Sequence, residues 1–152
     1  MTSLTYNNFL CLASDAAKSN PDTARKLRLW AADCAARVLP FYEEKGASDA
    51  PRKAIIAARQ FARGEIDDPE RESAWRAALT ASVDVSGGAY SAASAAESAA
   101  AWDAPLTAAR NAASAPTSAA AWSAERQWQF DRLIAWMSDD EPEDWPLSTP
   151  NQ

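Results

Sequence analysis

The sequence contains no histidine at all among its 152 residues. Without histidine the chain cannot build a Ser-His-Asp or Cys-His catalytic site, a histidine general base, or most kinds of zinc site. The Glu-x-x-His pairs of ferritin-type metal centres are excluded for the same reason. We therefore expect no metal site and no enzyme, and a carboxylate-only or lysine-dependent enzyme is the one catalytic alternative left.

Glycine is almost as scarce, with four residues in the whole chain. None of them stands in a GxGxxG or GxxxxGK pattern, so the sequence predicts no phosphate-binding loop and no cofactor. No run approaches the ~20 apolar residues of a membrane span. Residues 1–14 also lack the basic start and apolar centre of a signal peptide. We expect a cytoplasmic protein that does not bind a membrane.

The net charge is −6, and the isoelectric point is about 4.6. This balance argues against direct binding to nucleic acid, where lysine and arginine must displace counterions. The charge is uneven, because residues 25–63 are locally basic while residues 65–72 and 139–144 are acidic. Cys11 and Cys34 have no Cys-x-x-Cys spacing. Two buried free thiols are the favoured interpretation, and a disulfide between neighbouring helices is the alternative.

Apolar residues recur with the period of an α-helix, and no window alternates with the period of a β-strand. The clearest helical stretch begins at Asn20-Pro21, which supplies a cap and a proline in the first turn. One stripe of this helix is expected to face the core: Leu27, Trp30, Ala31, Cys34, Val38 and Phe41. The charged residues outside the stripe are expected to face solvent: Arg25, Lys26, Asp33 and Arg37.

Proline and glycine mark where the predicted helices end. Pro40 should end or kink the helix that starts at Pro21, and Gly46 and Gly64 stop the helices around them. The sequence thus predicts an all-α fold, a compact single-domain bundle of about six to seven helices with alanine-rich central helices, over residues 1–138. Residues 139–152, rich in acids and proline, are expected to form a tail without regular structure.

Residues 89–124 consist largely of alanine and serine. One interpretation is a low-complexity linker. The other, which we favour, is a set of helices packed closely together, because alanine has a high helix propensity and small side chains let helix axes approach. In that arrangement Tyr90, Trp102 and Trp122 would fill the gaps between the helices.

Four residues share one stripe of the predicted helix between Gly46 and Gly64: Arg52, Ile56, Arg59 and Arg63. The stripe is either a solvated face with weak ion pairs to nearby acids or a basic patch that binds an acidic partner or an anion. The acids expected to form such ion pairs are Glu65, Asp67 and Asp68. The net charge of the chain favours the solvated face.

The C-terminal tail carries five acidic residues: Asp139, Asp140, Glu141, Glu143 and Asp144. They are either a solubilising end or a contact for a basic partner. Trp145 beside them needs a surface to pack on. On the last predicted helix, Trp128 is either covered by a neighbouring helix, which we favour, or exposed as a binding anchor. Arg126 falls on the apolar side of that helix and should pair with a carboxylate.

Two segments carry a resemblance to a known family: LRLWAADCAARVLPFYEE and PRKAIIAARQFARGE. They resemble a family of small bacterial proteins labelled putative immunity proteins, which are associated with polymorphic toxin systems. The alanine-rich middle and the late ERQWQFDRL extend the similarity over about residues 27–133. The resemblance implies a helical fold and a toxin-binding role, but no binding residues. Members usually carry histidines in the alanine-rich helices, and this chain has none.

The leading hypothesis is a non-catalytic protein that neutralises a toxin or effector by binding it directly. Its acidic balance would suit a basic target. The alternatives are a phage-encoded inhibitor of a bacterial defence complex and a small-ligand-binding helical domain. The candidate partner-binding residues are Arg52, Arg59, Arg63, Trp128, Asp139, Asp140, Glu141, Glu143, Asp144 and Trp145.

Overall fold

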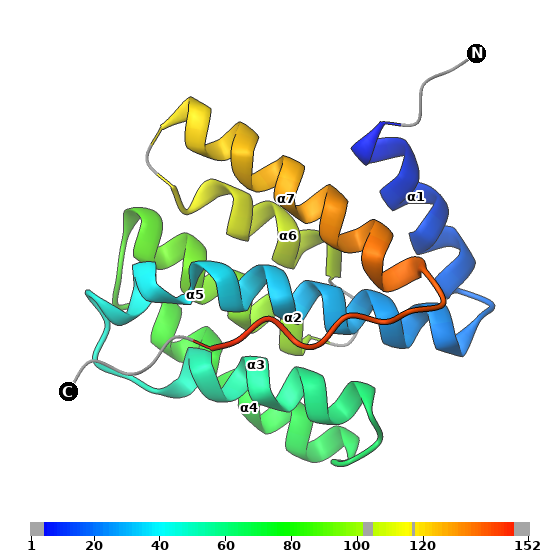
Figure 1. The fold of residues 1–152 in the computed structure, drawn as a ribbon. Helices are drawn as coiled ribbons and strands as arrows, with labels where there is room; N and C mark the ends of the chain where they lie inside the picture. The colour runs from blue at the N-terminus through cyan, green and yellow to red at the C-terminus, as the bar shows by residue number, and fades with distance from the viewer. Residues whose placement is uncertain (1–4, 102–104, 117, 148–152) are drawn as a thin grey trace.

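The computed structural model of the chain describes residues 5–101, 105–116 and 118–147. In this part of the chain seven α-helices and no β-strand are present, which confirms the all-α bundle (Figure 1). The helices are α1 (Tyr6–Ala17), α2 (Pro21–Glu43), α3 (Ala50–Ala62), α4 (Asp68–Ser82), α5 (Gly87–Ala100), α6 (Pro105–Ser114) and α7 (Ala119–Met137). No helix among the described residues is long and apolar enough to cross a bilayer.

The longest helix, α2, lies at the centre and packs against α1, α3, α5, α6 and α7. The Asn20 side chain caps its N-terminus, as predicted, by accepting hydrogen bonds from the N–H groups of Asp22 and Thr23. The predicted core stripe is buried except for Phe41 at the end of the helix, which is 36 % exposed. Because neighbours surround α2, its burial extends beyond that stripe.

Two expectations about α2 differ from the structure. Of the two effects expected of Pro40, an end to the helix is not observed, because α2 continues to Glu43. The extra turn buries the side chain of Tyr42, and the N–H of Glu44 donates to the carbonyl of Pro40 at 3.1 Å. This burial compensates for the hydrogen bond that proline cannot donate. The second error concerns Asp33, which was expected to face solvent and is 0 % exposed.

The alanine-rich helix α5 is buried on almost every side, against α2, α3, α4 and α6. Its alanine and serine side chains let four helices approach it closely, so the linker interpretation is wrong and the packed one is confirmed. The large aromatics do not fill the gaps, however. Tyr90 is 49 % and Trp122 is 45 % exposed, and Trp102 lies outside the described residues.

After α7 the chain forms no helix or strand in residues 138–147, which we call the C-terminal strap. The strap runs in an extended course across α2, between α3 and α7 (Figure 1).

Cys34 and Cys11 are both free thiols, but only Cys34 is buried. The expectation of two buried thiols is therefore wrong for Cys11, which lies on the exposed side of α1.

Candidate functional site

The carboxylate of Asp33 is fully buried in the middle of α2 and accepts four hydrogen bonds. Its Oδ1 accepts from Nη2 of Arg59 at 2.9 Å and from the backbone N–H of Trp145 at 2.9 Å. Its Oδ2 accepts from Nε of Arg132 at 2.9 Å and from Nε1 of Trp136 at 2.7 Å. One side chain thus joins α2 to α3, to α7 and to the C-terminal strap.

The electrostatic balance around Asp33 explains why this burial is tolerated. Removing an ion from water costs several kcal/mol unless opposite charges and hydrogen bonds replace the water. Here the guanidiniums of Arg59 and Arg132 supply two positive charges next to the carboxylate. The Nε of Arg59 has no hydrogen-bond partner among the described residues and lies 3.8 Å from Oδ2 of Asp144. Asp144 therefore supplies a second negative charge, next to Arg59, so that two carboxylates balance the two guanidiniums.

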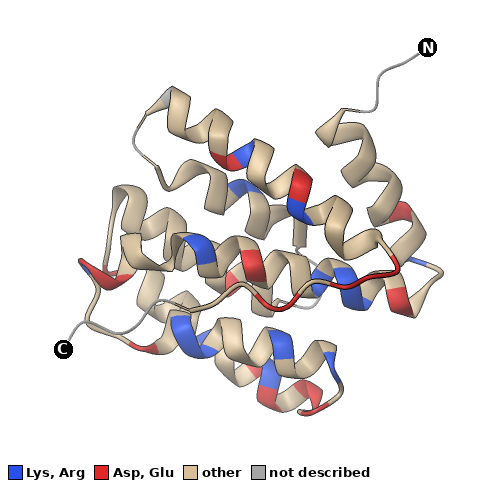
Figure 2. Cartoon of the chain, viewed as in Figure 1, with Lys and Arg blue, Asp and Glu red and all other residues tan. Residues whose placement is uncertain are grey.

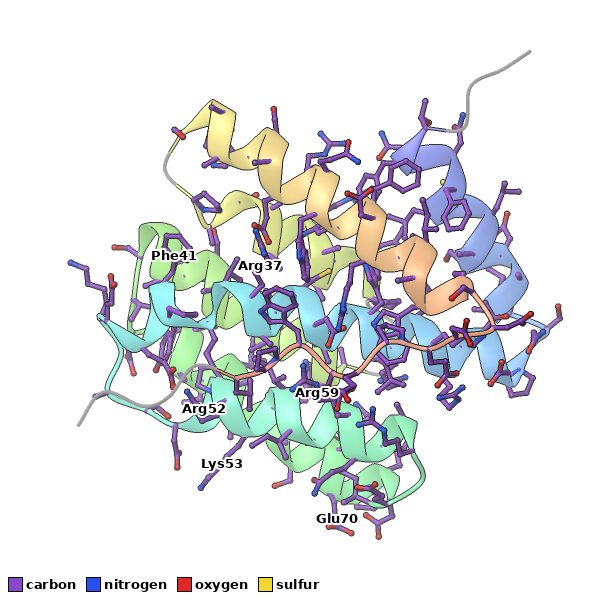
Figure 3. All side chains as sticks on the ribbon, viewed as in Figure 1. Arg37, Phe41, Arg52, Lys53, Arg59 and Glu70 are labelled. Atoms are coloured by element: carbon purple, nitrogen blue, oxygen red, sulfur yellow. The ribbon has the colours of Figure 1, made fainter. Side chains whose placement is uncertain are left out.

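The same arginines hold the backbone of the strap. Nη2 of Arg59 donates to the carbonyl oxygen of Trp145 at 2.6 Å, and Nη2 of Arg132 donates to the carbonyl oxygen of Glu143. Since the donors come from α3 and α7, the strap is fixed from both sides. Figure 3 shows Arg37 and Arg59 on the two sides of the strap.

Two further ion pairs hold the strap through its acidic side chains. Arg63 forms a bidentate ion pair with Asp144, with N–O distances of 2.7 and 2.6 Å, and Arg25 forms an ion pair with Glu141. Partial burial raises the pKa of Asp144, but the hydrogen bonds from Arg63 and the neighbouring positive charges outweigh it and leave that pKa below its usual value. The hydrogen bond from Arg25 likewise lowers the pKa of Glu141. Both carboxylates are charged at neutral pH.

The indole of Trp145 has the packing surface that its position in the tail required. It meets Trp128 edge-on, with 5.0 Å between the ring centres. The guanidinium of Arg37 lies 4.4 Å from the Trp128 ring and 5.5 Å from the Trp145 ring, and that of Arg132 lies 5.6 Å from the Trp145 ring. Trp128 is half-buried, because Arg37 and the Trp145 ring of the strap lie against its indole. The two guanidiniums make cation–π contacts with these rings.

The predicted basic stripe on α3 forms ion pairs, but not with the expected acids. Arg52 pairs with Glu43 at 2.7 Å, Arg59 with Asp33, and Arg63 with Asp144. Arg59 is only 8 % exposed, so its expected position on an open face is wrong. The expected acids are close to α3 in sequence, whereas the observed partners of Arg59 and Arg63 lie on α2 and on the strap.

The acidic residues of the tail divide into two groups. Glu141 and Asp144 bind arginines of the same chain, a possibility that neither sequence-based interpretation included. Asp139, Asp140 and Glu143 are exposed at the surface of the strap. Figure 2 shows the acidic strap running past the basic residues of α2 and α3. The strap therefore presents three carboxylates outward while its other groups hold it in place.

Arg126 departs from its prediction because it is exposed. Its guanidinium lies 5.8 Å from the centre of the Tyr6 ring, and Nη2 reaches the side-chain oxygen of Asn7 at 3.5 Å. The contact is thus with an uncharged amide of α1, and not with the carboxylate that we expected.

Sequence reasoning missed the centre of this network. Asp33, Arg132 and Trp136 were not candidates, although Arg132 and Trp136 both donate hydrogen bonds to the buried carboxylate of Asp33. A signal was present, because Asp33 stands inside the run WAADCAA, where every neighbour within three positions is apolar. An acid in such a run, on a helix that α5 and α6 also cover, has little access to water. Among the described residues, no group of acids and cysteines could hold a metal ion.

Comparison with known proteins adds one family. Residues 17–135 match the family model described as Imm-5 like putative immunity protein. The match covers α2 to α6 and most of α7, and it ends before the C-terminal strap. The comparisons with curated proteins and with solved structures give no match.

Proposed function

Because the chain belongs to the Imm-5 like putative immunity protein family, we propose that it neutralises a protein toxin by binding it directly, without catalysis. The family match carries this proposal. The toxin would belong to a bacterial polymorphic toxin system, and the protein would act in the cytoplasm, where it protects its own cell. Neutralisation of this kind requires a rigid scaffold and a surface complementary to the toxin.

The C-terminal strap supports a more specific version of the proposal, in which its outer surface contacts the toxin. Asp139, Asp140 and Glu143 are exposed there on a backbone that Arg59 and Arg132 already hold. A segment ordered before binding loses less conformational entropy when it binds. Three fixed carboxylates are therefore a better contact than a free acidic tail of the same composition.

The charge of this surface favours a basic toxin. The whole chain carries a net charge of −6, and opposite charges on two proteins accelerate their encounter and exclude wrong partners. A toxin that acts on nucleic acid has a basic surface for the phosphate backbone. We therefore propose a nuclease-like toxin, whose substrate-binding surface the strap would cover.

The test is a protection assay with the captured partner. A tagged chain is used to isolate stoichiometric partners from lysate of its native host, and the partner is then expressed in a bacterium with and without this chain. We expect a partner that stops growth alone and is harmless in the presence of the chain. Failure to recover any stoichiometric protein, or a partner whose effect on growth is unchanged by the chain, would contradict the proposal.

Matched charge reversals test the role of the strap. The triple variant Asp139→Lys, Asp140→Lys and Glu143→Lys should lose protection and affinity. The control changes three exposed acids elsewhere to the same extent: Glu44→Lys, Glu65→Lys and Asp84→Lys. The control has the same net charge as the triple variant. Equal affinity of the two variants for the toxin would therefore show that the strap is not the contact. That result would not contradict the proposal that the chain binds a toxin.

A further inference from the structure

A pocket of about 550 Å³ lies between α1, α6 and α7 and opens to solvent. Its lining includes Tyr6, Cys11, Arg110, Trp122, Arg126 and Gln129. The volume falls in the range of ordinary small-molecule sites, roughly 300–1,000 Å³. The pocket shares no residue with the strap, which contacts α7 through Trp128 and Arg132.

The charge in this pocket contrasts with that of the chain. Two arginines line it, while no aspartate or glutamate does so among the described residues. Elsewhere in the structure arginines pair with carboxylates, as seen for Arg25, Arg37, Arg52, Arg59, Arg63, Arg71, Arg76 and Arg132. Within the described residues, neither Arg110 nor Arg126 makes an ion pair. Arg110 and Arg126, which make no ion pair with any described residue, thus lie in the same pocket of an acidic chain.

The floor of the pocket does not supply the missing negative charge. Gln129 is 1 % exposed, and its amide donates to the carbonyl oxygen of Ala109 at 2.9 Å. Its Oε1 accepts from the hydroxyl of Tyr6 at 2.8 Å. Burial raises the pKa of Tyr6, although the charges of Arg126 and Arg110 act in the opposite direction. Tyr6 is therefore a neutral phenol, and no described residue that lines the pocket carries a negative charge to compensate the two guanidiniums.

The walls of the pocket indicate the rest of the ligand. Leu10 and Leu106 contribute aliphatic surface, and the indole of Trp122 is 45 % exposed at the edge. Its Nε1–H donates to the carbonyl oxygen of Pro116, which fixes the ring. A planar apolar group can stack on an indole held in this way, while arginine binds carboxylate or phosphate oxygens through two parallel hydrogen bonds.

From this arrangement we propose that the pocket binds a small organic anion, in which a carboxylate or phosphate is attached to a flat apolar group. Arg110 and Arg126 bind the anionic group, and Trp122 with the leucines binds the flat group. This site is independent of toxin binding, because it uses neither the strap nor a protein partner.

The direct test uses phenyl phosphate and benzoate, with benzyl alcohol as the neutral comparison. Binding is followed by the NMR signal of the Trp122 indole N–H, assigned with the variant Trp122→Phe. We expect saturable shifts with both anions and none with benzyl alcohol. The double variant Arg110→Gln and Arg126→Gln should weaken binding by roughly tenfold or more, since hydrogen bonds to charged groups are the strong ones. The control Arg76→Gln, an exposed arginine on α4, should bind as the unchanged chain does.

Cys11 provides a second, independent readout. It is an exposed thiol in the pocket lining, whereas Cys34 is fully buried and serves as the unreactive internal reference. We compare its reaction with dithiobis(nitrobenzoate), an aromatic carboxylate, and with dithiodipyridine, a neutral reagent. The ratio of the two rates should fall in the double variant, and phenyl phosphate should protect Cys11. The ratio also cancels any general change in thiol reactivity.

Clear outcomes would overturn the proposal. These are the absence of a saturable shift with either anion, equal affinity in the double variant, or binding of benzyl alcohol as tight as that of phenyl phosphate. Both arginines are exposed, so the double variant should fold, which circular dichroism checks. None of these measurements requires the toxin, so their failure would leave the proposed function untouched.

Discussion

The backbone N–H of Trp145 donates a 2.9 Å hydrogen bond to Oδ1 of Asp33, across 112 positions of sequence. This contact connects the centre of the longest helix to the last described segment of the chain. It makes the C-terminal strap part of the folded domain, because the strap completes the hydrogen bonding of a carboxylate that has no access to water.

Removing the charge of Asp33 should be among the most damaging single changes. In Asp33→Asn the guanidiniums of Arg59 and Arg132 lose their shared carboxylate while they remain largely covered. Breaking a buried ion pair from one side costs roughly 3–5 kcal/mol. We expect a loss of this size in the free energy of unfolding measured with urea. The exposed control Asp84→Asn should change it by less than about 0.5 kcal/mol, and a similar small effect at Asp33 would contradict the network described above.

Truncating the indole of the strap should loosen it locally. Trp145→Ala removes the edge contact with Trp128 and the cover over Arg37. Loss of a partly buried aromatic contact should cost about 1–3 kcal/mol. The measurement is amide hydrogen exchange, in which the N–H of residue 145 should exchange much faster. In the control Trp122→Ala, which alters an exposed ring on the same helix as Trp128, exchange in the strap should stay as it is.

The strap should also respond to acid. The pKa values of Asp144 and Glu141 are lowered in the folded chain, so their contribution to stability is fully present above the unfolded values of about 3.9 and 4.3. That contribution declines as the pH falls below those values and is lost once the pH passes the lower folded values. Urea unfolding at pH 6 and pH 3 should show the decline, and a combined Asp144→Asn and Glu141→Gln variant should show a shallower one. An unchanged slope in that variant would contradict the assignment.

Because α5 is closely packed, the stability of the fold should depend strongly on the size of its side chains. Ala96 is 0 % exposed on a helix that touches four others. The change Ala96→Leu should therefore destabilise the fold by about 1–3 kcal/mol through overpacking. The same change at the exposed Ala77 of α4 should have little effect. Thermal unfolding of the two variants compares them directly, and equal melting temperatures would mean that α5 is not tightly enclosed.

Local signals in the sequence were sufficient for most of the fold. The cap at Asn20 and the stop at Gly64, which has a φ of 73°, depend on a few neighbouring residues and were confirmed. Pro40 does not mark the end of α2, since the helix continues to Glu43 and buries Tyr42. The alanine-rich helices were predicted correctly from propensity. The exposure of Tyr90 was not, since it depends on how the helix ends are placed.

The site was less predictable, because its residues are brought together from distant parts of the chain. Composition indicated that the strap has no regular structure, but not that Arg59 and Arg132 would hold it. The burial of Asp33 likewise follows from α3, α7 and the strap acting together. A helical wheel drawn for one helix cannot contain that information, and the isolated acid between alanines was the only hint.

The long separation between Asp33 and Trp145 has a consequence for biosynthesis. At the usual rate of about 5–20 residues per second, a ribosome needs roughly 6–20 seconds to add the residues that lie between them. Throughout that interval the emerging polypeptide carries a carboxylate whose last hydrogen-bond donor has not yet been made. The hydrogen bonding of Asp33 is therefore completed only after Trp145 has been synthesised, long after α2 itself.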